Sequence, residues 1–216
     1  MKRVTWIFWL LLLACAEQAR AQQRIKVACV GNSITEGVGV APGKRYPEIL
    51  QELLGGRYDV RNFGISARTL LRKGDFPYWK EALYDSALAW APDIVIIKLG
   101  TNDSKPQNWR YGGEFRTNYT DFVRSFQLLA SHPKVYACTP LPVFEERWGI
   151  NDPVVRRKIV PAVRKVARKT KATLINLYEP FAGKAALTYD GIHPNAEGCL
   201  LLAQVIYSAL LKKPAR

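Results

Sequence analysis

The chain has 216 residues, of which 48% are hydrophobic and 23% are charged. This composition suits one globular domain with a full core and excludes an intrinsically disordered chain. The formal net charge of +14 favours anionic partners, but no zinc-finger spacing or RNP-like strand accompanies the basic residues, so we expect no nucleic-acid partner.

The beginning of the chain has the features of an export signal. Lys2 and Arg3 give a positively charged start, residues 4–14 form an apolar run, and Ala19 and Ala21 define a small-x-small cleavage site. The apolar run is too short to span a bilayer.

We therefore expect a signal peptide over residues 1–21 and a single domain over residues 22–216. The mature protein would be exported to the bacterial periplasm or the cell exterior. A competing interpretation is that residues 12–15 form a lipobox. In that case Cys15 would be acylated and would anchor the protein to lipid.

The cysteines do not predict a disulfide framework. Cleavage after Ala21 would leave three cysteines, an odd number that allows at most one disulfide. Cys29 and Cys138 lie inside apolar runs, and Cys199 lies in a helical stretch. We expect all three to be thiols of the core.

Five short apolar runs rich in β-branched residues recur along the chain and predict buried strands. They occupy residues 25–30, 58–63, 93–99, 134–139 and 173–177. Longer segments with helical periodicity separate them, and strands that alternate with helices imply a parallel sheet covered on both faces. In such a sheet the functional site lies beyond the carboxyl ends of the strands.

Helical periodicity is clearest in three segments. Apolar residues share one face in residues 46–54 and 122–129, and a final helix is expected from about residue 196 to residue 211, after Asn195. The densest basic stretch, residues 156–171, also has a helical pattern with an apolar side. We interpret its charges as a solvated helix face in preference to a binding patch.

A serine follows the first strand directly, in the segment Gly-Asn-Ser-Ile-Thr-Glu-Gly at residues 31–37. Ser33 would lie on the loop that leaves the strand, where its hydroxyl can face the crevice at the edge of the sheet. On position alone, the simpler interpretation is a serine that caps a helix N-terminus. The other motifs must decide between a nucleophile and a cap.

An aspartate and a histidine stand three residues apart in the segment Tyr-Asp-Gly-Ile-His-Pro at residues 189–194. In a tight turn Asp190 can fix the tautomer of the His193 imidazole while the other ring nitrogen faces a serine. The chain has two histidines, and the other, His132, precedes a proline in a turn-like segment. His193 is therefore the candidate general base, although the segment also suits a capped helix start.

Two further loops offer hydrogen-bond donors to an oxyanion. Asn102 follows the third strand in the segment Gly-Thr-Asn-Asp, and its side-chain N–H would stabilise negative charge developing on a carbonyl oxygen. An Asx-turn is the simpler role for such an asparagine. Residues 62–69 follow the second strand, and a backbone N–H there would complete the same oxyanion hole.

These four segments resemble the SGNH (GDSL-like) hydrolases in their order and spacing. The resemblance covers nearly the whole chain after residue 21 and is nearest to bacterial carbohydrate esterases of the acetylxylan-esterase and sialate O-acetylesterase types. It implies a flavodoxin-like three-layer αβα sandwich, with a five-stranded parallel sheet in the order 2-1-3-4-5. It also implies a reaction without a metal ion or an organic cofactor.

Carried over residue by residue, the resemblance assigns Ser33 as nucleophile, His193 as base and Asp190 as the residue that orients the base. The oxyanion hole would comprise the backbone N–H of Ser33, the backbone N–H of Ala67 and the side chain of Asn102. The expected activity is that of an exported serine esterase, which hydrolyses short-chain esters, chiefly acetyl esters on carbohydrates, through an acyl-enzyme.

Two positions depart from the family's pattern. Asn32 replaces the usual aspartate before the serine, which keeps hydrogen bonding in the loop but removes a charge. Ala67 replaces the usual glycine, and its Cβ would be strained if the backbone there needs a positive φ. These departures motivate an alternative, a surface glycan-binding protein on the same scaffold with impaired catalysis.

Side chains near the motifs predict how a glycan would be held. Trp109 and Trp148 follow the third and fourth strands and would stack on sugar rings, although core packing explains such residues equally well. Arg68 flanks a proposed oxyanion donor and would receive an acidic sugar. The chain shows no long apolar insertion, which favours short acyl groups. A lysophospholipase or thioesterase of the same family is the remaining alternative.

Overall fold

The structure, a computed structural model, describes residues 24–212. Its centre is a sheet in which all neighbouring strands are parallel. The strands are β1 (Ile25–Gly31), β2 (Tyr58–Gly64), β3 (Ile94–Lys98), β4 (Lys134–Cys138) and β5 (Thr173–Ile175), in the order β2-β1-β3-β4-β5. The predicted parallel sheet and its strand order are confirmed. The expected signal peptide and Cys15 lie outside the described residues.

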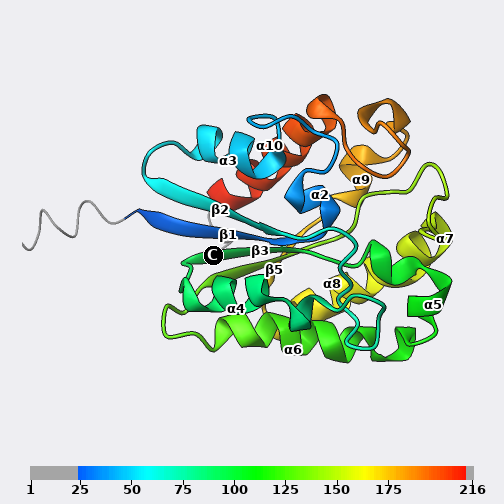
Figure 1. The fold of residues 1–216 in the computed structure, drawn as a ribbon. Coiled ribbons are helices and arrows are strands. Elements are labelled where there is room, and N and C mark those ends of the chain that lie inside the picture. The colour runs from blue at the N-terminus through cyan, green and yellow to red at the C-terminus, as the bar shows by residue number, and fades with distance from the viewer. Residues whose placement is uncertain (1–23, 213–216) are drawn as a thin grey trace, which may run out of the picture.

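Helices cover both faces of this sheet (Figure 1). One face carries α2 (Ser33–Glu36), α3 (Tyr46–Leu54) and α10 (Ala196–Leu211), and the other carries α4 (Ala82–Ala89), α6 (Phe115–Gln127) and α8 (Val160–Thr170). The predicted three-layer αβα sandwich is therefore confirmed. The connections contain short helices and helical turns: η1 (Tyr78–Lys80), η2 (Asn102–Ser104), α5 (Pro106–Trp109), η3 (Gly112–Glu114), α7 (Asp152–Val154), η4 (Val155–Ile159), α9 (Tyr178–Phe181) and η5 (Ala185–Leu187).

The strands divide the core into two clusters, because successive residues of a strand point to opposite faces of the sheet. In β1, Ala28 and Val30 face the layer of α4, α6 and α8, whereas Val27 and Cys29 face α3 and α10. Burial on both faces explains why β1, β3 and β4 have continuous apolar runs. The three cysteines of the described part are buried free thiols, as predicted.

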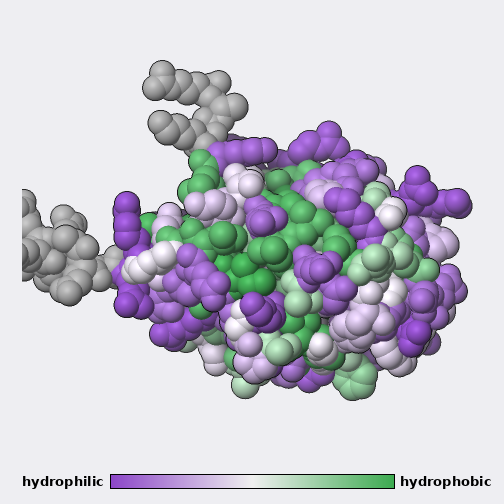
Figure 2. All heavy atoms as spheres, turned by 90° about the horizontal axis from the view of Figure 1, so that it is seen from above, coloured by the Kyte–Doolittle hydropathy of each residue, from purple (hydrophilic) through white to green (hydrophobic). Residues whose placement is uncertain are grey.

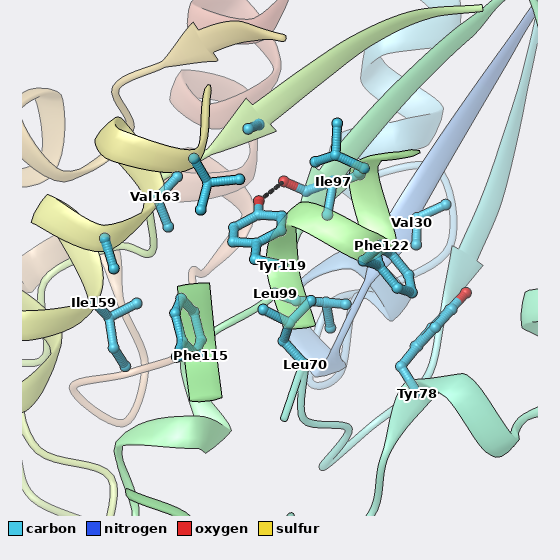
Figure 3. Packing of buried hydrophobic residues seen from close by; sticks show 14 of the residues in the cluster. Val30, Leu70, Tyr78, Ile97, Leu99, Phe115, Tyr119, Phe122, Ile159 and Val163 are labelled. Carbon is cyan, nitrogen blue, oxygen red and sulfur yellow. Dashed lines mark hydrogen bonds between the residues drawn. The ribbon is translucent and has the colours of Figure 1, made fainter. Parts of the chain in front are cut away.

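Aromatic residues of α6 form the centre of one cluster (Figure 3). Phe115, Tyr119 and Phe122 are fully buried there, and each such ring stabilises the fold by roughly 2 kcal/mol through its burial. The Tyr119 hydroxyl donates a hydrogen bond to the Ile97 carbonyl at 3.3 Å. This packing fixes α6 to β3, whose carboxyl end carries one loop of the candidate site.

The face formed by α3 and α10 is apolar at its surface as well as beneath it. Figure 2 shows green side chains gathered in the middle of this face and polar side chains around them. Leu53 of α3 and Leu200 and Leu211 of α10 are exposed. In the part of the chain that the structure describes, no helix is long and apolar enough to cross a bilayer.

The basic stretch, which has a helical pattern interrupted by a proline, is helical in the structure and begins with a π-helical turn. Residues 155–159 form the π-helical turn η4, and α8 begins at Val160. Pro161 has no N–H to donate, and its ring would clash with the carbonyl four residues earlier in a regular α-helix. The wider π-helical turn accommodates the proline. Most of the basic side chains are exposed, which agrees with a solvated helix face.

Candidate active site

The candidate site is formed by loops that leave three neighbouring strands at the same edge of the sheet. Gly31 ends β1 and pairs with Gly64 of β2 and with Lys98 of β3. Because β1 lies between β2 and β3, the chain connections diverge at this point, where open parallel sheets bind their ligands. Gly31 is needed for close packing, since a Cβ there would collide with the Thr35 side chain and the Lys98 carbonyl.

Ser33 begins the short helix α2 directly after β1. Asn32 is the N-cap of this helix, because its Oδ1 accepts a hydrogen bond from the Ile34 N–H at 3.2 Å. The capping interpretation of Ser33 is therefore wrong, and its hydroxyl remains for another partner. Asparagine keeps the cap that the family's aspartate would make, but its buried Nδ2 has no hydrogen-bond partner among the described residues.

The partner of Ser33 comes from the other end of the chain. Ser33 Oγ lies 2.9 Å from His193 Nε2, across 160 positions of sequence, and His193 Nδ1 lies 2.7 Å from Asp190 Oδ2. The other carboxylate oxygen accepts the backbone N–H groups of Ile192 and His193 at 2.9 and 2.7 Å. The buried carboxylate thus holds the imidazole in place, with Nε2 turned toward the serine hydroxyl.

Asp190 is held in its ionised form. Burial acts to raise the pKa of its carboxyl, but hydrogen bonds from the His193 backbone and ring and from the Ile192 N–H outweigh burial and lower the pKa. The carboxylate is therefore charged at neutral pH and can stabilise a protonated imidazole.

The two proposed oxyanion donors lie on loops that contact each other. Asn102 Nδ2 donates a hydrogen bond to the Arg68 carbonyl at 3.1 Å, next to the peptide of Ala67. A side-chain amide has a second N–H, which this bond leaves available. Ala67 has a φ of +64°, so the backbone there adopts the left-handed conformation that glycine favours. The strain expected at this position is present.

Asp103 links the loop after β2 to the loop after β3 through hydrogen bonds. Its buried carboxylate accepts the N–H groups of Leu70 and Leu71 at 3.0 and 2.7 Å. Burial raises the pKa of this carboxyl to about 6, although the two N–H groups act in the opposite direction. Sequence reasoning missed this residue. The signal that could have found it was its position directly after Asn102.

Two of the predicted glycan-binding side chains are engaged in loop contacts. Arg68 donates to Glu81 Oε1 at 2.8 Å and to the Ser66 carbonyl at 2.9 Å, so its charge is paired. Trp109 packs against Phe115 and lies close to Gly112. These contacts hold the loops after β2 and β3.

Trp148 lies beside the imidazole, together with an aromatic residue that sequence reasoning missed. The ring centroids of Trp148 and His193 are 5.8 Å apart in an edge arrangement. Tyr189 stacks on the imidazole of His193, with 5.7 Å between centroids and 15° between planes. Its place directly before Asp190 was the only signal in the sequence. His193 therefore contacts two aromatic side chains.

Outside these loops the described residues present a groove but no cluster of metal ligands. Among residues 24–212, no three His, Cys, Asp or Glu side chains are grouped so that they could hold a metal ion. A groove between β5 and α10 is lined by residues that include Leu174, Val205 and Ser208. It does not bring a nucleophile and a base into contact, so the candidate site is placed at Ser33 and His193.

Comparison with known proteins gives a family match and a similar sequence. The sequence model of the GDSL-like lipase/acylhydrolase family matches residues 29–200. An acetylxylan esterase from Xylanibacter ruminicola is 41% identical over 212 residues, and the alignment covers 89% of this chain and 44% of that protein. The chain therefore spans less than half the length of this relative.

Solved structures share the fold at lower identity. An aryl esterase from M. smegmatis is 22% identical with a TM-score of 0.69, and the match covers 86% of this chain and 97% of that chain. A carbohydrate acetylesterase from Sinorhizobium meliloti is 24% identical with a TM-score of 0.69, over 87% of this chain and 98% of that chain. At these identities the likeness establishes the fold.

Proposed function

The chain belongs to the GDSL-like lipase/acylhydrolase family, and from this premise we propose that it is an exported serine esterase that removes acetyl groups from carbohydrates. The observation that carries the proposal is the pair of contacts that links Asp190 to His193 and His193 to Ser33. Such a series activates a serine hydroxyl as a nucleophile. Similarity to an acetylxylan esterase over 89% of the chain supports acetyl esters as substrates.

In the proposed reaction, Ser33 Oγ attacks the carbonyl carbon of the ester while His193 Nε2 takes the hydroxyl proton. The ionised Asp190 stabilises the imidazolium that forms. Negative charge on the carbonyl oxygen is received by the backbone N–H groups of Ser33 and Ala67 and by the Asn102 side chain. In such sites the loss of one donor lowers the rate by roughly a hundredfold to a thousandfold.

Collapse of the tetrahedral intermediate breaks the bond to the alcohol, which leaves with the proton carried by His193. Water then attacks the acetyl group on Ser33, with His193 again acting as base, and acetate is released. The three residues return to their starting protonation states. The cycle needs no group beyond the chain, the ester and water.

Neutral acetylated glycans fit the surroundings of the site best. Arg68 is paired with Glu81, and Lys105 lies 3.8 Å from Asp75, so neither cation near the oxyanion loops is left without a counter-charge. Trp148, in contrast, offers an exposed ring for stacking on a sugar. We therefore propose that stacking, not charge, holds the glycan.

Acetate release from a panel of acetylated glycans tests the proposed function. We expect wild type to release acetate and Ser33→Ala to lose at least a thousandfold in rate. Ser208→Ala, which removes an exposed serine of α10, is the matched control and should keep the wild-type rate. Release by Ser33→Ala at the wild-type rate would overturn the proposal. A preference for long acyl chains would instead favour a lysophospholipase or thioesterase.

Export is part of the proposal and is tested separately. N-terminal sequencing of the protein from the periplasm or culture medium should begin at residue 22. A lipid-modified N-terminus at Cys15 would instead establish the lipobox interpretation.

A further inference from the structure

The imidazole of His193 contacts two aromatic rings that are themselves open to solvent. His193 is 7% exposed, whereas Tyr189 is 48% exposed and Trp148 is 63% exposed. The stacked arrangement of Tyr189 and the edge arrangement of Trp148 are both contacts to the same imidazole. Both aromatic side chains are therefore open to contact with a molecule bound next to His193.

Trp148 has a backbone conformation that is unfavourable for a non-glycine residue. Trp148 has a φ of +54° and is followed by Gly149 at +79°. A left-handed conformation costs a non-glycine residue on the order of 1 kcal/mol, and asparagine or glycine would adopt it more easily. Asn151 stabilises the loop that carries Trp148, because its Nδ2 donates hydrogen bonds to the carbonyls of Ser104 and Gly149. Neither burial nor turn geometry accounts for a tryptophan here.

The segment that follows α2 holds the side chain of Tyr189 in place. Its hydroxyl donates to the Val38 carbonyl at 3.2 Å. Gly39 makes room for the ring, because a Cβ at this position would collide with it. This contact between residues far apart in sequence thus holds the tyrosine ring nearly parallel to the imidazole.

The chemistry of ester cleavage decides which part of the substrate meets these rings. The leaving alkoxide takes its proton from His193 Nε2, so the alcohol part of the ester lies on the imidazole side of the site. The carbonyl oxygen lies on the other side, toward the loops that carry Ala67 and Asn102. Side chains around the imidazole therefore contact the alcohol, and those around the oxyanion donors contact the acyl group.

We propose that Trp148 and Tyr189 form an alcohol-side subsite next to His193, which binds the pyranose ring that carries the acetyl ester. This inference rests on the proposed function and adds which part of the substrate is selected and by which residues. The C–H face of a pyranose packs well on an aromatic ring. Glu145 and Arg147, exposed and paired with each other at 2.8 Å next to Trp148, would meet the sugar hydroxyls.

The subsite can be examined apart from acylation, because the acetyl-enzyme also reacts with alcohols. A sugar hydroxyl in the subsite would give its proton to His193 Nε2 and attack the acetyl carbonyl. The bond to Ser33 Oγ would break, and the serine would recover the proton. Water competes for the same acetyl-enzyme, so the ratio of transfer to hydrolysis reports on binding of the sugar alone.

We would form the acetyl-enzyme from 4-nitrophenyl acetate, offer methyl β-xyloside as acceptor, and measure acetylated xyloside and free acetate. We expect Trp148→Ala to lower the transfer-to-hydrolysis ratio by about fivefold, the loss expected for one stacking contact. Trp148→Phe should retain most of the ratio. Leu128→Ala removes an exposed apolar side chain after α6 and should keep the wild-type ratio.

The outcomes separate this inference from the function on which it rests. An equal ratio in wild type and Trp148→Ala would overturn the subsite while the esterase stands. Transfer to a linear alcohol but not to the xyloside by wild type would also overturn it. Failure of wild type to turn over the aryl acetate would contradict the proposed function itself, and the subsite with it.

Discussion

Ala67 combines a half-buried position in the candidate site with an unfavourable backbone conformation. Its φ of +64° places the Cβ close to backbone atoms, which costs an L-residue on the order of 1 kcal/mol. The backbone N–H that is proposed to bind the oxyanion would be present with alanine or with glycine at position 67. Alanine therefore keeps the donor and adds strain. Strain of this kind is often found at functional sites.

Ala67→Gly should therefore raise the free energy of unfolding by roughly 0.5 kcal/mol, because the strain that is relieved exceeds the entropy cost of the freer glycine in the unfolded chain. Urea denaturation measures the change. Ala91→Gly is the matched control, because Ala91 also has a positive φ, of +49°, but lies between α4 and β3. A gain at position 91 without a gain at position 67 would mean that the site conformation is not strained.

Asp103 is the link between two elements, the loop after β2 and the helical turn η2 after β3. It accepts two backbone N–H groups and is fully buried. The loop after β2 is thereby held against Asn102, which itself bonds to the Arg68 carbonyl. Both proposed oxyanion donors are therefore expected to depend on the same cross-link.

Asp103→Ala should destabilise the protein by about 3 kcal/mol, because two buried N–H groups lose their acceptor. It should also lower kcat for acetate release at least tenfold at a temperature where the variant is folded. Asp103→Asn keeps one acceptor oxygen, so its stability and its kcat should lie between those of wild type and those of Asp103→Ala. Denaturation and steady-state kinetics measure both effects. A stability loss with an unchanged kcat would show that the cross-link does not position the donors.

The elements differ in how well the sequence predicts them. β1, β3 and β4 were predicted because strands buried on both faces need continuous apolar runs, and α10 was predicted because Asn195 caps it and apolar residues follow. The π-helical turn η4 was not, since it results from how Pro161 is accommodated within a helix. Short helices such as α5 and α7 have too few residues to produce a period.

Across the whole molecule, some residues of the candidate site could be predicted from the sequence and others could not. The contacts of Ser33 with His193 and of His193 with Asp190 could be predicted, because Ser33 follows a strand and the other two residues stand in a recognisable turn. Tyr189 and Asp103 could not, since their roles depend on contacts with residues far away in sequence, Val38 and Leu71 among them. Contacts of this kind form only when the chain has folded.

Lys98 is an ionisable group in the middle of the core. It ends β3, is almost fully buried, and its Nζ has no hydrogen-bond partner among the described residues. Burial lowers the pKa of this amine from 10.5 to about 7, and the thiols of Cys138 and Cys199 act weakly in the opposite direction. The folded protein therefore releases a proton from Lys98 at a lower pH than the unfolded chain does.

This difference predicts how stability depends on pH. Between pH 7 and 10.5 the unfolded chain binds more protons at Lys98 than the folded protein, so the contribution to stability rises with pH, by up to about 1.4 kcal/mol per pH unit. Below pH 7 the penalty is at its full size. Lys98→Met should therefore be more stable than wild type, most of all at pH 6 to 7, with a smaller advantage at pH 10. Urea denaturation across this range measures it. An advantage that does not change with pH would contradict the buried-amine account.

The central claim is that His193 activates Ser33, and covalent labelling with a fluorophosphonate tests it most directly. We expect wild type to be labelled, with the modified peptide mapping to Ser33, no labelling of Ser33→Ala, and labelling at least a hundredfold slower in His193→Gln. Labelling at another serine, or at an equal rate without the imidazole, would contradict the account. A wild-type protein that binds acetylated glycan but resists the reagent would instead be a glycan-binding protein on this scaffold.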